Sequence, residues 1–208
     1  MPFRMRRRAK AAGEIPPGVR GLTPVERRRV QGWLEQLPYY RGRLRVLVAE
    51  DLVERNGRLA AGGSGQAERM HAASFLPHRR IVLDRSLFSR RRELARILYH
   101  EIFHFLWARL GNSLRRSYEE IVLREWQERA RGELGWSAEK LKLGLAPGQV
   151  RRRSRQWRAY VCESFCDSAA WVCLPGRRKH VEWTLKPRFR RRRRLWFQTS
   201  DVLPRLQL

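Results

Sequence analysis

The chain has 208 residues, of which 42% are hydrophobic, so it can bury one core but hardly two. It carries 46 Lys and Arg against 20 Asp and Glu, a net charge of +26, and this excess indicates an anionic partner such as nucleic acid or another polyanion. The sequence has no apolar leader and no stretch of about 18 apolar residues, which argues against secretion and membrane insertion and predicts a cytoplasmic protein.

The first predicted helix is marked by Thr23-Pro24-Val25-Glu26, which has the layout of a capping box with proline at the first helical position. This helix should run to about Leu37, because Pro38 ends it. The next segment, Arg43 to Val48, alternates in polarity and predicts a half-buried strand before a turn at Asn56-Gly57.

Two further strands are predicted after a Gly-rich connector from Ala60 to Gly65, at Met70 to Phe75 and at Arg80 to Asp84. The second strand runs almost directly into an apolar helix that we expect to be capped near Ser89 and stopped by Gly111. This strand either offers an exposed edge to an extended peptide or is an ordinary member of the sheet.

The apolar helix contains the sequence His100-Glu101-Ile102-Phe103-His104. Residues four apart share one face of a helix, so both imidazoles can reach one metal ion while Glu101 holds a water molecule beside it. Burying these groups on an apolar helix is costly unless a metal or a hydrogen-bond network satisfies them. The pattern, HExxH, predicts a zinc site with His100 and His104 as ligands.

Three more helical segments follow. Ser117-Tyr118-Glu119-Glu120 is a second capping-box layout and predicts a helix to about Arg131, and Ser137 should cap a short helix that ends near Gly144. The stretch from Leu145 to Arg153 contains proline, glycine and three arginines, which favours a linker. We therefore expect the next helix to begin at about Ser154 and to end before Pro175-Gly176.

A catalytic zinc ion needs a third protein ligand. The metzincin pattern would supply a glycine and a histidine at the positions of Trp107 and Leu110, so that pattern is excluded. On the helix expected after Ser154, Glu163 and Asp167 share one face and have apolar neighbours, which favours a buried site over a solvated helix face.

With this second motif, residues 79 to 175 resemble the gluzincin metallopeptidases, and particularly their compact single-domain relatives, the minigluzincins. The resemblance implies Zn²⁺ as cofactor, with His100, His104 and Glu163 as ligands, Glu101 as the general base, and Asp167 as the carboxylate that orients a ligand imidazole. It implies an α+β fold, a small zincin-like domain in which a short mixed or antiparallel sheet packs on the HExxH helix and on a second, Glu-bearing helix.

The resemblance also calls for a side chain that stabilises the developing oxyanion, for which Tyr160 and His180 are the candidates. An ordinary packing or surface role is the alternative for both. We place the catalytic domain at residues 22–187, between a basic, flexible N-terminal tail, residues 1–21, and an Arg-rich C-terminal tail, residues 188–208.

The expected function is hydrolysis of peptide bonds in an extended polypeptide. Two alternatives stay open: a regulatory peptidase associated with nucleic acid, which would cleave a repressor or DNA-linked protein, and a non-enzymatic basic protein with a structural zinc ion. The first alternative rests on arginine-rich clusters, which suit phosphate contacts; they lie at residues 6–8, 90–92, 151–153, 177–179 and 190–194. Cys162, Cys166 and Cys173 lack the spacing of a metal cluster and are expected to be small core residues.

Overall fold

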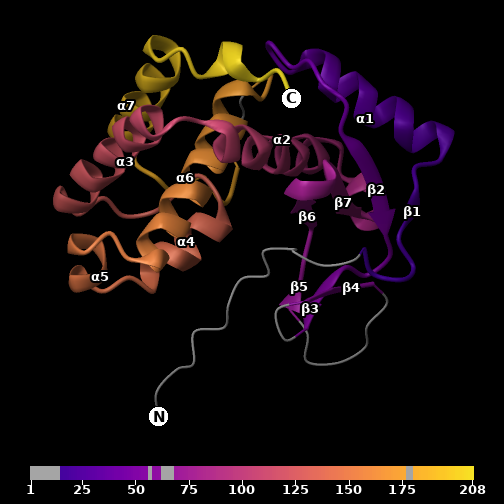
Figure 1. Cartoon of the computed structure of the whole chain (residues 1–208), viewed down its shortest axis with the longest axis horizontal. Helices are drawn as coiled ribbons and strands as arrows, with labels where there is room; N and C mark the ends of the chain where they lie inside the picture. The colour runs from indigo at the N-terminus through magenta and orange to yellow at the C-terminus, as the bar shows by residue number, and fades with distance from the viewer. Residues whose placement is uncertain (1–14, 56–57, 62–67, 177–179) are drawn as a thin grey trace.

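The computed structural model describes residues 15–55, 58–61, 68–176 and 180–208. The predicted turn at Asn56-Gly57, most of the Gly-rich connector and residues 1–14 of the predicted N-terminal tail lie outside these ranges. The described chain forms seven α-helices and two small sheets, which confirms the mixed α+β class (Figure 1).

The chain enters the fold through β1 (Arg20–Gly21) and α1 (Pro24–Gln36). Thr23 is the N-cap of α1, and its capping box is complete because Glu26 N donates to Thr23 Oγ1 at 3.3 Å and Thr23 N donates to Glu26 Oε2 at 2.8 Å. This confirms the predicted start of the helix. The strand β1 pairs antiparallel with β2 (Arg45–Ala49), so the last two residues of the predicted N-terminal tail belong to the main sheet.

The main sheet has the strand order β1-β2-β7-β6. The strand β7 (Arg80–Asp84) has the predicted bounds and lies inside the sheet, parallel to β2 and antiparallel to β6 (Ala72–Phe75). Because it is paired on both sides, β7 offers no free edge, and the ordinary-strand alternative holds for it. Among the described strands, β6 is the edge on the side of the HExxH helix. A second sheet contains β4 (Arg58–Ala60), β3 (Val53–Arg55) and β5 (Glu68–Arg69) in that order.

The HExxH helix is α2 (Arg91–Arg109), which follows the short 3-10 helices η1 (Leu76–His78) and η2 (Arg85–Ser89). The prediction of a cap near Ser89 is off by one residue, because the N-cap is Arg90 and no side chain caps the helix. Gly111 is the N-cap of α3 (Asn112–Gln127). The capping box predicted at Ser117 is wrong, since this residue lies inside α3 and its hydroxyl donates to the Leu114 carbonyl at 3.0 Å.

The remaining helices are α4 (Trp136–Leu143), α5 (Pro147–Arg151), α6 (Arg155–Cys173) and α7 (Pro187–Thr199). The cap of α4 is Gly135, two residues before the predicted Ser137, and α5 occupies the stretch that was predicted to be a linker. For α6 the prediction is confirmed: Ser154 is the N-cap and accepts from Trp157 N at 3.2 Å. None of the described helices has the length and apolar character that crossing a membrane requires.

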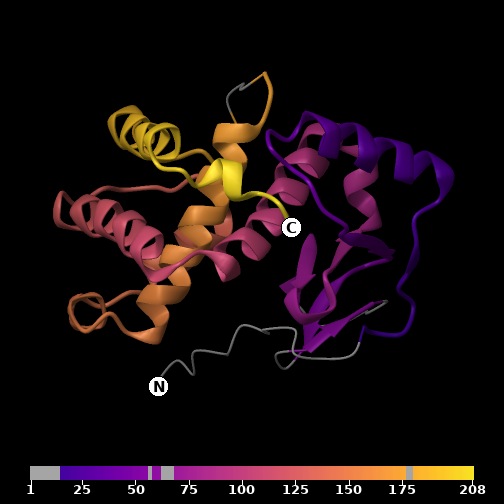
Figure 2. The ribbon, with the colours of Figure 1, turned by 45° about the horizontal axis from the view of Figure 1, so that its top comes forward.

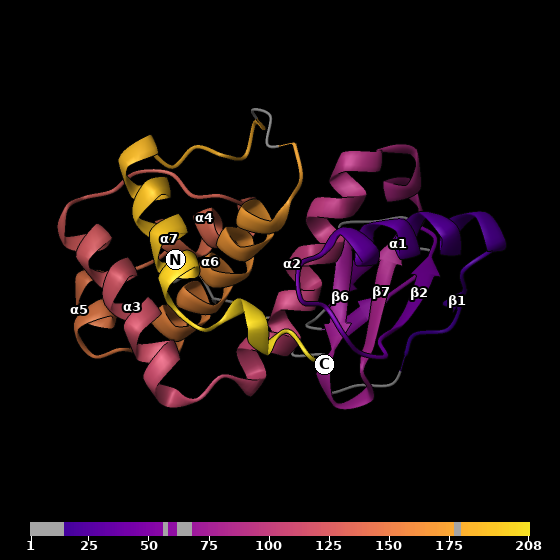
Figure 3. The ribbon, with the colours of Figure 1, turned by 90° about the horizontal axis from the view of Figure 1, so that it is seen from above.

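Helices α2 and α6 pack against each other in the middle of the molecule, with α1 and the main sheet on one side and α3, α4, α5 and α7 on the other (Figure 3). The predicted C-terminal tail is instead a packed helix, because α7 buries Phe189, Arg193, Trp196 and Phe197. The segment after α7, including η3 (Leu203–Arg205), returns across α2 toward the chain between α1 and β2 (Figure 2).

There Leu208 N donates to the Arg41 carbonyl at 2.6 Å and Arg41 N donates to the Leu206 carbonyl at 3.1 Å. The approach is so close that a Cβ atom at Gly42 would lie 2.0 Å from the Leu208 carbonyl oxygen.

Candidate metal centre

The predicted zinc ligands meet where α2 packs on α6. His100 and His104 lie one turn apart on α2, and Glu163 lies on the facing side of α6. The side chains of His100 and Glu163 are 9% and 7% exposed, and that of His104 is 19% exposed. The sequence places these groups on one face of each helix because residues four apart lie above one another; packing of α2 on α6 then brings the two faces together.

His100 is held by Asp167, whose Oδ1 lies 2.7 Å from His100 Nδ1. A carboxylate accepts hydrogen bonds, so Nδ1 carries the proton and Nε2 presents its lone pair. That Nε2 atom lies 3.1 Å from His104 Nε2 and 3.3 Å from Glu163 Oε2. The other carboxylate oxygen, Glu163 Oε1, is 3.6 Å from His104 Nε2. The contact with Asp167 therefore orients the ring of His100.

These donor atoms are of the type and spacing that suit zinc. A tetrahedral zinc ion with bonds of about 2.0–2.1 Å keeps its ligand atoms about 3.3–3.4 Å apart. Here the two imidazole nitrogens are 3.1 Å apart, and each lies 3.3 or 3.6 Å from a different oxygen of the Glu163 carboxylate. Two neutral imidazoles and one carboxylate are also a ligand set that catalytic zinc sites use, with a fourth position left open. The residues fit the ion.

A side chain of the main sheet holds Glu101 in position. The Ser74 hydroxyl, on β6, donates to Glu101 Oε2 at 2.5 Å and lies 3.0 Å from the Glu101 carbonyl oxygen. One ligand atom from each of His100, Glu101 and His104 lies within 4.8 Å of the others, so the Glu101 carboxylate lies beside the two imidazoles. The sequence did not indicate Ser74, because strand alternation gives the face of a side chain but not the helix that covers it.

Gly135 makes room for the Asp167 carboxylate. A Cβ atom added to this residue would lie 2.3 Å from Asp167 Cγ and 2.4 Å from Oδ2, closer than atoms can approach without movement. Because Gly135 is the N-cap of α4, the carboxylate lies at the positive end of that helix dipole, which favours a negative charge. Sequence reasoning missed this residue, since its role depends on a carboxylate that lies 32 positions further along the chain, on α6.

A second group of donors surrounds the other face of His104. Cys166 Sγ lies 3.4 Å and Cys162 Sγ lies 3.7 Å from His104 Nδ1. A hydrogen bond from Cys166 lowers the pKa of the Cys162 thiol well below its usual value, whereas burial raises the pKa of Cys166. The prediction of core residues is right about the burial of Cys166 and Cys173, but it missed the imidazole beside the first two sulfur atoms.

The two oxyanion candidates have hydrogen-bond partners other than the metal ligands. The Tyr160 hydroxyl donates to Glu133 Oε1 at 2.5 Å in a fully buried cluster, and burial followed by the Glu133 charge raises its pKa well above the usual value. His180 Nε2 lies 3.1 Å from Glu93 Oε2, near the start of α2. Both side chains therefore have partners outside the group formed by His100, His104 and Glu163.

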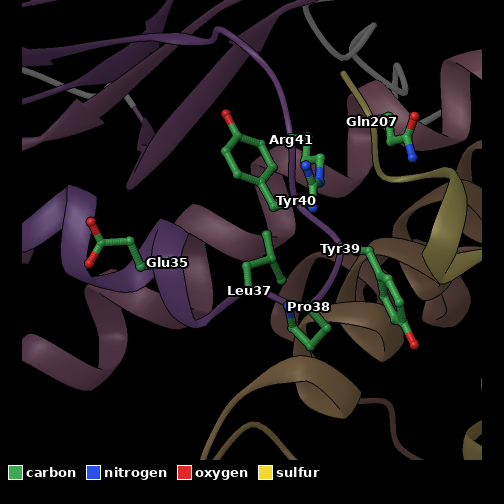
Figure 4. Close-up of a pocket in the computed structure, with 7 residues that line it drawn as sticks. All are labelled: Glu35, Leu37, Pro38, Tyr39, Tyr40, Arg41 and Gln207. Atoms are coloured by element: carbon green, nitrogen blue, oxygen red, sulfur yellow. The ribbon is translucent and has the colours of Figure 1, made fainter.

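A surface hollow lies elsewhere, at the end of α1 beside the C-terminal segment (Figure 4). It is lined by Glu35, Leu37, Pro38, Tyr39, Tyr40, Arg41 and Gln207, none of which belongs to the metal centre. The candidate site is therefore identified by its nitrogen and oxygen donor atoms and not by the shape of this hollow.

The arginine clusters differ in exposure. Residues 90–92 and 151–153 are exposed, whereas residues 6–8 and 177–179 lie outside the described chain. Within 190–194, Arg193 is fully buried between Glu125 and Glu133, and Arg192 pairs with Glu128 at 2.8 Å. That run is therefore largely used in contacts within the fold, and of the five clusters the ones at residues 90–92 and 151–153 are exposed throughout in the described chain.

No protein-family model, curated protein or solved structure matches this chain. In two groups of three residues within the described chain, one ligand atom from each residue lies within 4.8 Å of the others, and His104 belongs to both. One group consists of His100, Glu101 and His104, and the other of His104, Cys162 and Cys166.

Proposed function

We propose that this chain is a zinc-dependent metallopeptidase of the gluzincin type, built on a zincin-like domain. The observation that carries the proposal is the convergence of His100 Nε2, His104 Nε2 and the Glu163 carboxylate at separations of 3.1–3.6 Å. The pairing of His100 with Asp167 supports it, because metal-binding imidazoles commonly use their second ring nitrogen in this way.

In this proposal His100, His104 and Glu163 hold the ion, which when bound polarises a carbonyl group and lowers the pKa of water toward neutrality. Glu101 takes the proton from the attacking water, whose oxygen joins the carbonyl carbon of the peptide. Glu101 then returns that proton to the amine nitrogen as the carbon–nitrogen bond breaks. The hydrogen bond from Ser74 keeps the carboxylate at its place beside the ligands.

An extended polypeptide is the substrate class that the fold favours. The strand β6 is the edge of the main sheet in the described chain, and it carries Ser74, which contacts Glu101. An extended peptide that added to this edge would form main-chain hydrogen bonds next to the candidate base. The edge strand that we assign to this role is therefore β6, in place of β7.

The test compares metal content and peptidase activity for the wild-type chain, Glu101→Gln and Glu163→Ala, with Glu120→Gln as a matched control on the exposed side of α3. Glu101→Gln should lower the rate by about 10²–10⁴-fold and retain zinc, because it removes the base and no ligand. Glu163→Ala should lose zinc affinity, and Glu120→Gln should resemble the wild type. A wild-type protein that binds no zinc when prepared without chelator contradicts the proposal. Zinc binding without turnover of any unfolded polypeptide would favour the structural-zinc alternative.

Association with nucleic acid or another polyanion is a second candidate property. The net charge of +26 and the exposed clusters at residues 90–92 and 151–153 favour it. Contacts of this kind bind phosphates without reading bases, so affinity should fall steeply as salt rises. Together with peptidase chemistry, such binding would suit a peptidase that acts on proteins held on nucleic acid.

A further inference from the structure

His104 faces donors on both sides of its ring. Nε2 points to His100 and Glu163, as described above, and Nδ1 lies 3.4 Å from Cys166 Sγ and 3.7 Å from Cys162 Sγ. These two cysteines are four residues apart on α6, so both thiols lie on the same face of that helix. One atom from each of His104, Cys162 and Cys166 lies within 4.8 Å of the other two.

The second set of donors differs in chemical character from the first. Two sulfur atoms and one imidazole nitrogen are soft donors that select thiophilic ions such as Cu(I), Zn²⁺ or Cd²⁺, whereas two imidazoles and a carboxylate are harder. Cys162 is partly exposed and His104 is 19% exposed, so an ion can reach this side from solvent. Cys166 is buried, so one of the sulfur donors lies in the core of the protein.

A neutral imidazole presents a lone pair on only one of its two nitrogens. When Nε2 of His104 is the lone-pair nitrogen, Nδ1 carries the proton and can donate it toward Cys166. When Nδ1 binds an ion, the proton moves to Nε2, which lies 3.1 Å from His100 Nε2 and can donate to the lone pair of that nitrogen. The two sets of donors therefore compete for one residue.

We propose that Cys162, Cys166 and Nδ1 of His104 form a binding site for a thiophilic metal ion, and that its occupation excludes zinc from the site of His100, His104 and Glu163. Binding releases the two thiol protons to solvent as the metal–sulfur bonds form, and the imidazole proton transfers from Nδ1 to Nε2. The exclusion rests on the proposed zinc function, whereas the thiophilic site does not.

The probe is Cd²⁺, added to reduced, metal-free protein while the ultraviolet sulfur-to-cadmium charge-transfer band is recorded. The wild-type chain should develop the band up to one equivalent. Cys162→Ala/Cys166→Ala should lose it, and Cys173→Ala, which removes the third thiol, should keep it. A urea-unfolding transition like that of the wild type, followed by tryptophan fluorescence, shows that the double variant is folded. No band in the wild type, or a band that survives in the folded double variant, overturns the proposal.

A zinc titration of the cadmium-loaded protein tests the exclusion. Zinc should suppress the band in the wild type, and Glu163→Gln should raise the zinc concentration required by at least about tenfold, because this change weakens zinc on the Nε2 side only. An unchanged requirement means that zinc displaces cadmium at the thiols and overturns the exclusion. A charge-transfer band in a protein that shows no peptidase activity when loaded with zinc alone contradicts the proposed function and leaves this site standing.

Discussion

Replacement of Arg193 by methionine should destabilise the whole fold. The guanidinium is 0% exposed and donates to Glu125 Oε2 through Nε and Nη2 at 3.0 and 2.7 Å, and to Glu133 Oε2 through Nη1 at 2.7 Å. Lys142 Nζ, at 2.9 Å from Glu133 Oε1, is the other cation in this cluster. The variant Arg193→Met therefore keeps the buried volume and leaves two buried carboxylates with one lysine.

The expected cost follows from this burial. Removing one partner of a buried ion pair costs about 3–5 kcal/mol, because the remaining charge stays without compensation. A natural domain has only about 5–15 kcal/mol of stability in total. For a chain of this length, about 2–4 °C of Tm is lost per kcal/mol, so the melting temperature should fall by about 6–20 °C.

The penalty should depend on pH. Burial opposes the charge of Glu133, but Arg193 and Lys142 outweigh it and hold the pKa of this residue at about 2, below its ordinary value of 4.5. A group with a lowered folded-state pKa stabilises the fold above its unfolded pKa, and this contribution is lost as pH falls from about 5 toward 2. Without Arg193 that contribution is smaller, because only Lys142 and the Tyr160 hydroxyl still lower the pKa of Glu133. The difference between variant and wild type should therefore be largest near pH 7 and smaller at pH 4.

Urea unfolding of the metal-free proteins, followed by tryptophan fluorescence at pH 7 and pH 4, measures this difference. Arg191→Met is the matched control, because Arg191 is an exposed arginine of the same helix and should change stability by less than about 0.5 kcal/mol. A loss below about 1 kcal/mol for Arg193→Met at pH 7, or a loss of the same size at pH 4, would refute the reasoning.

Three further outcomes are expected. Asp167→Ala should weaken zinc binding by about 10–100-fold, because His100 loses the partner that orients it; equal zinc affinity in a chelator competition would show that Asp167 has no such role. Gly135→Ala should also weaken zinc binding although it changes no ligand, since the new Cβ displaces the Asp167 carboxylate, and unchanged zinc affinity would contradict the close approach. Replacing the arginines at 90–92 with glutamine should reduce the salt dependence of binding to a duplex oligonucleotide, and an unchanged slope would remove that cluster from the surface that binds the polyanion.

The sequence predicted the parts of the site that depend on one helix at a time. Spacing of four residues put His100 and His104 on one face of α2, and the same rule paired Glu163 with Asp167 on α6. Which other residues meet these faces depends on how helices and sheet pack, and no local pattern carries that information. The hydroxyl of Ser74 and the two thiols beside His104 therefore became visible only in the structure.

The C-terminal helix was missed for a related reason. A run of arginines is typical of a solvated tail, and the carboxylates that neutralise Arg193 lie 68 and 60 residues earlier in the chain, at Glu125 and Glu133. The start of α3 was misplaced because the layout at Ser117 has the residues of a capping box inside a helix that had already begun at Asn112. In the first case, contacts with residues far away in the sequence outweigh the local pattern. In the second, the helix begins before the residues that form the pattern.

The buried guanidinium also bears on the order in which the fold forms. Helices α3, α4 and α6 precede α7 in the chain, so Glu125 and Glu133 are made well before the cation that they bind. Contacts over such long separations form late, because the intervening loop must close first. Arg193 also donates to Ser168, the neighbour of Asp167, at 3.2 Å. We therefore expect α7 to dock late in folding and to fix the position of α6. A nascent chain should then acquire its metal affinity only after α7 has been synthesised.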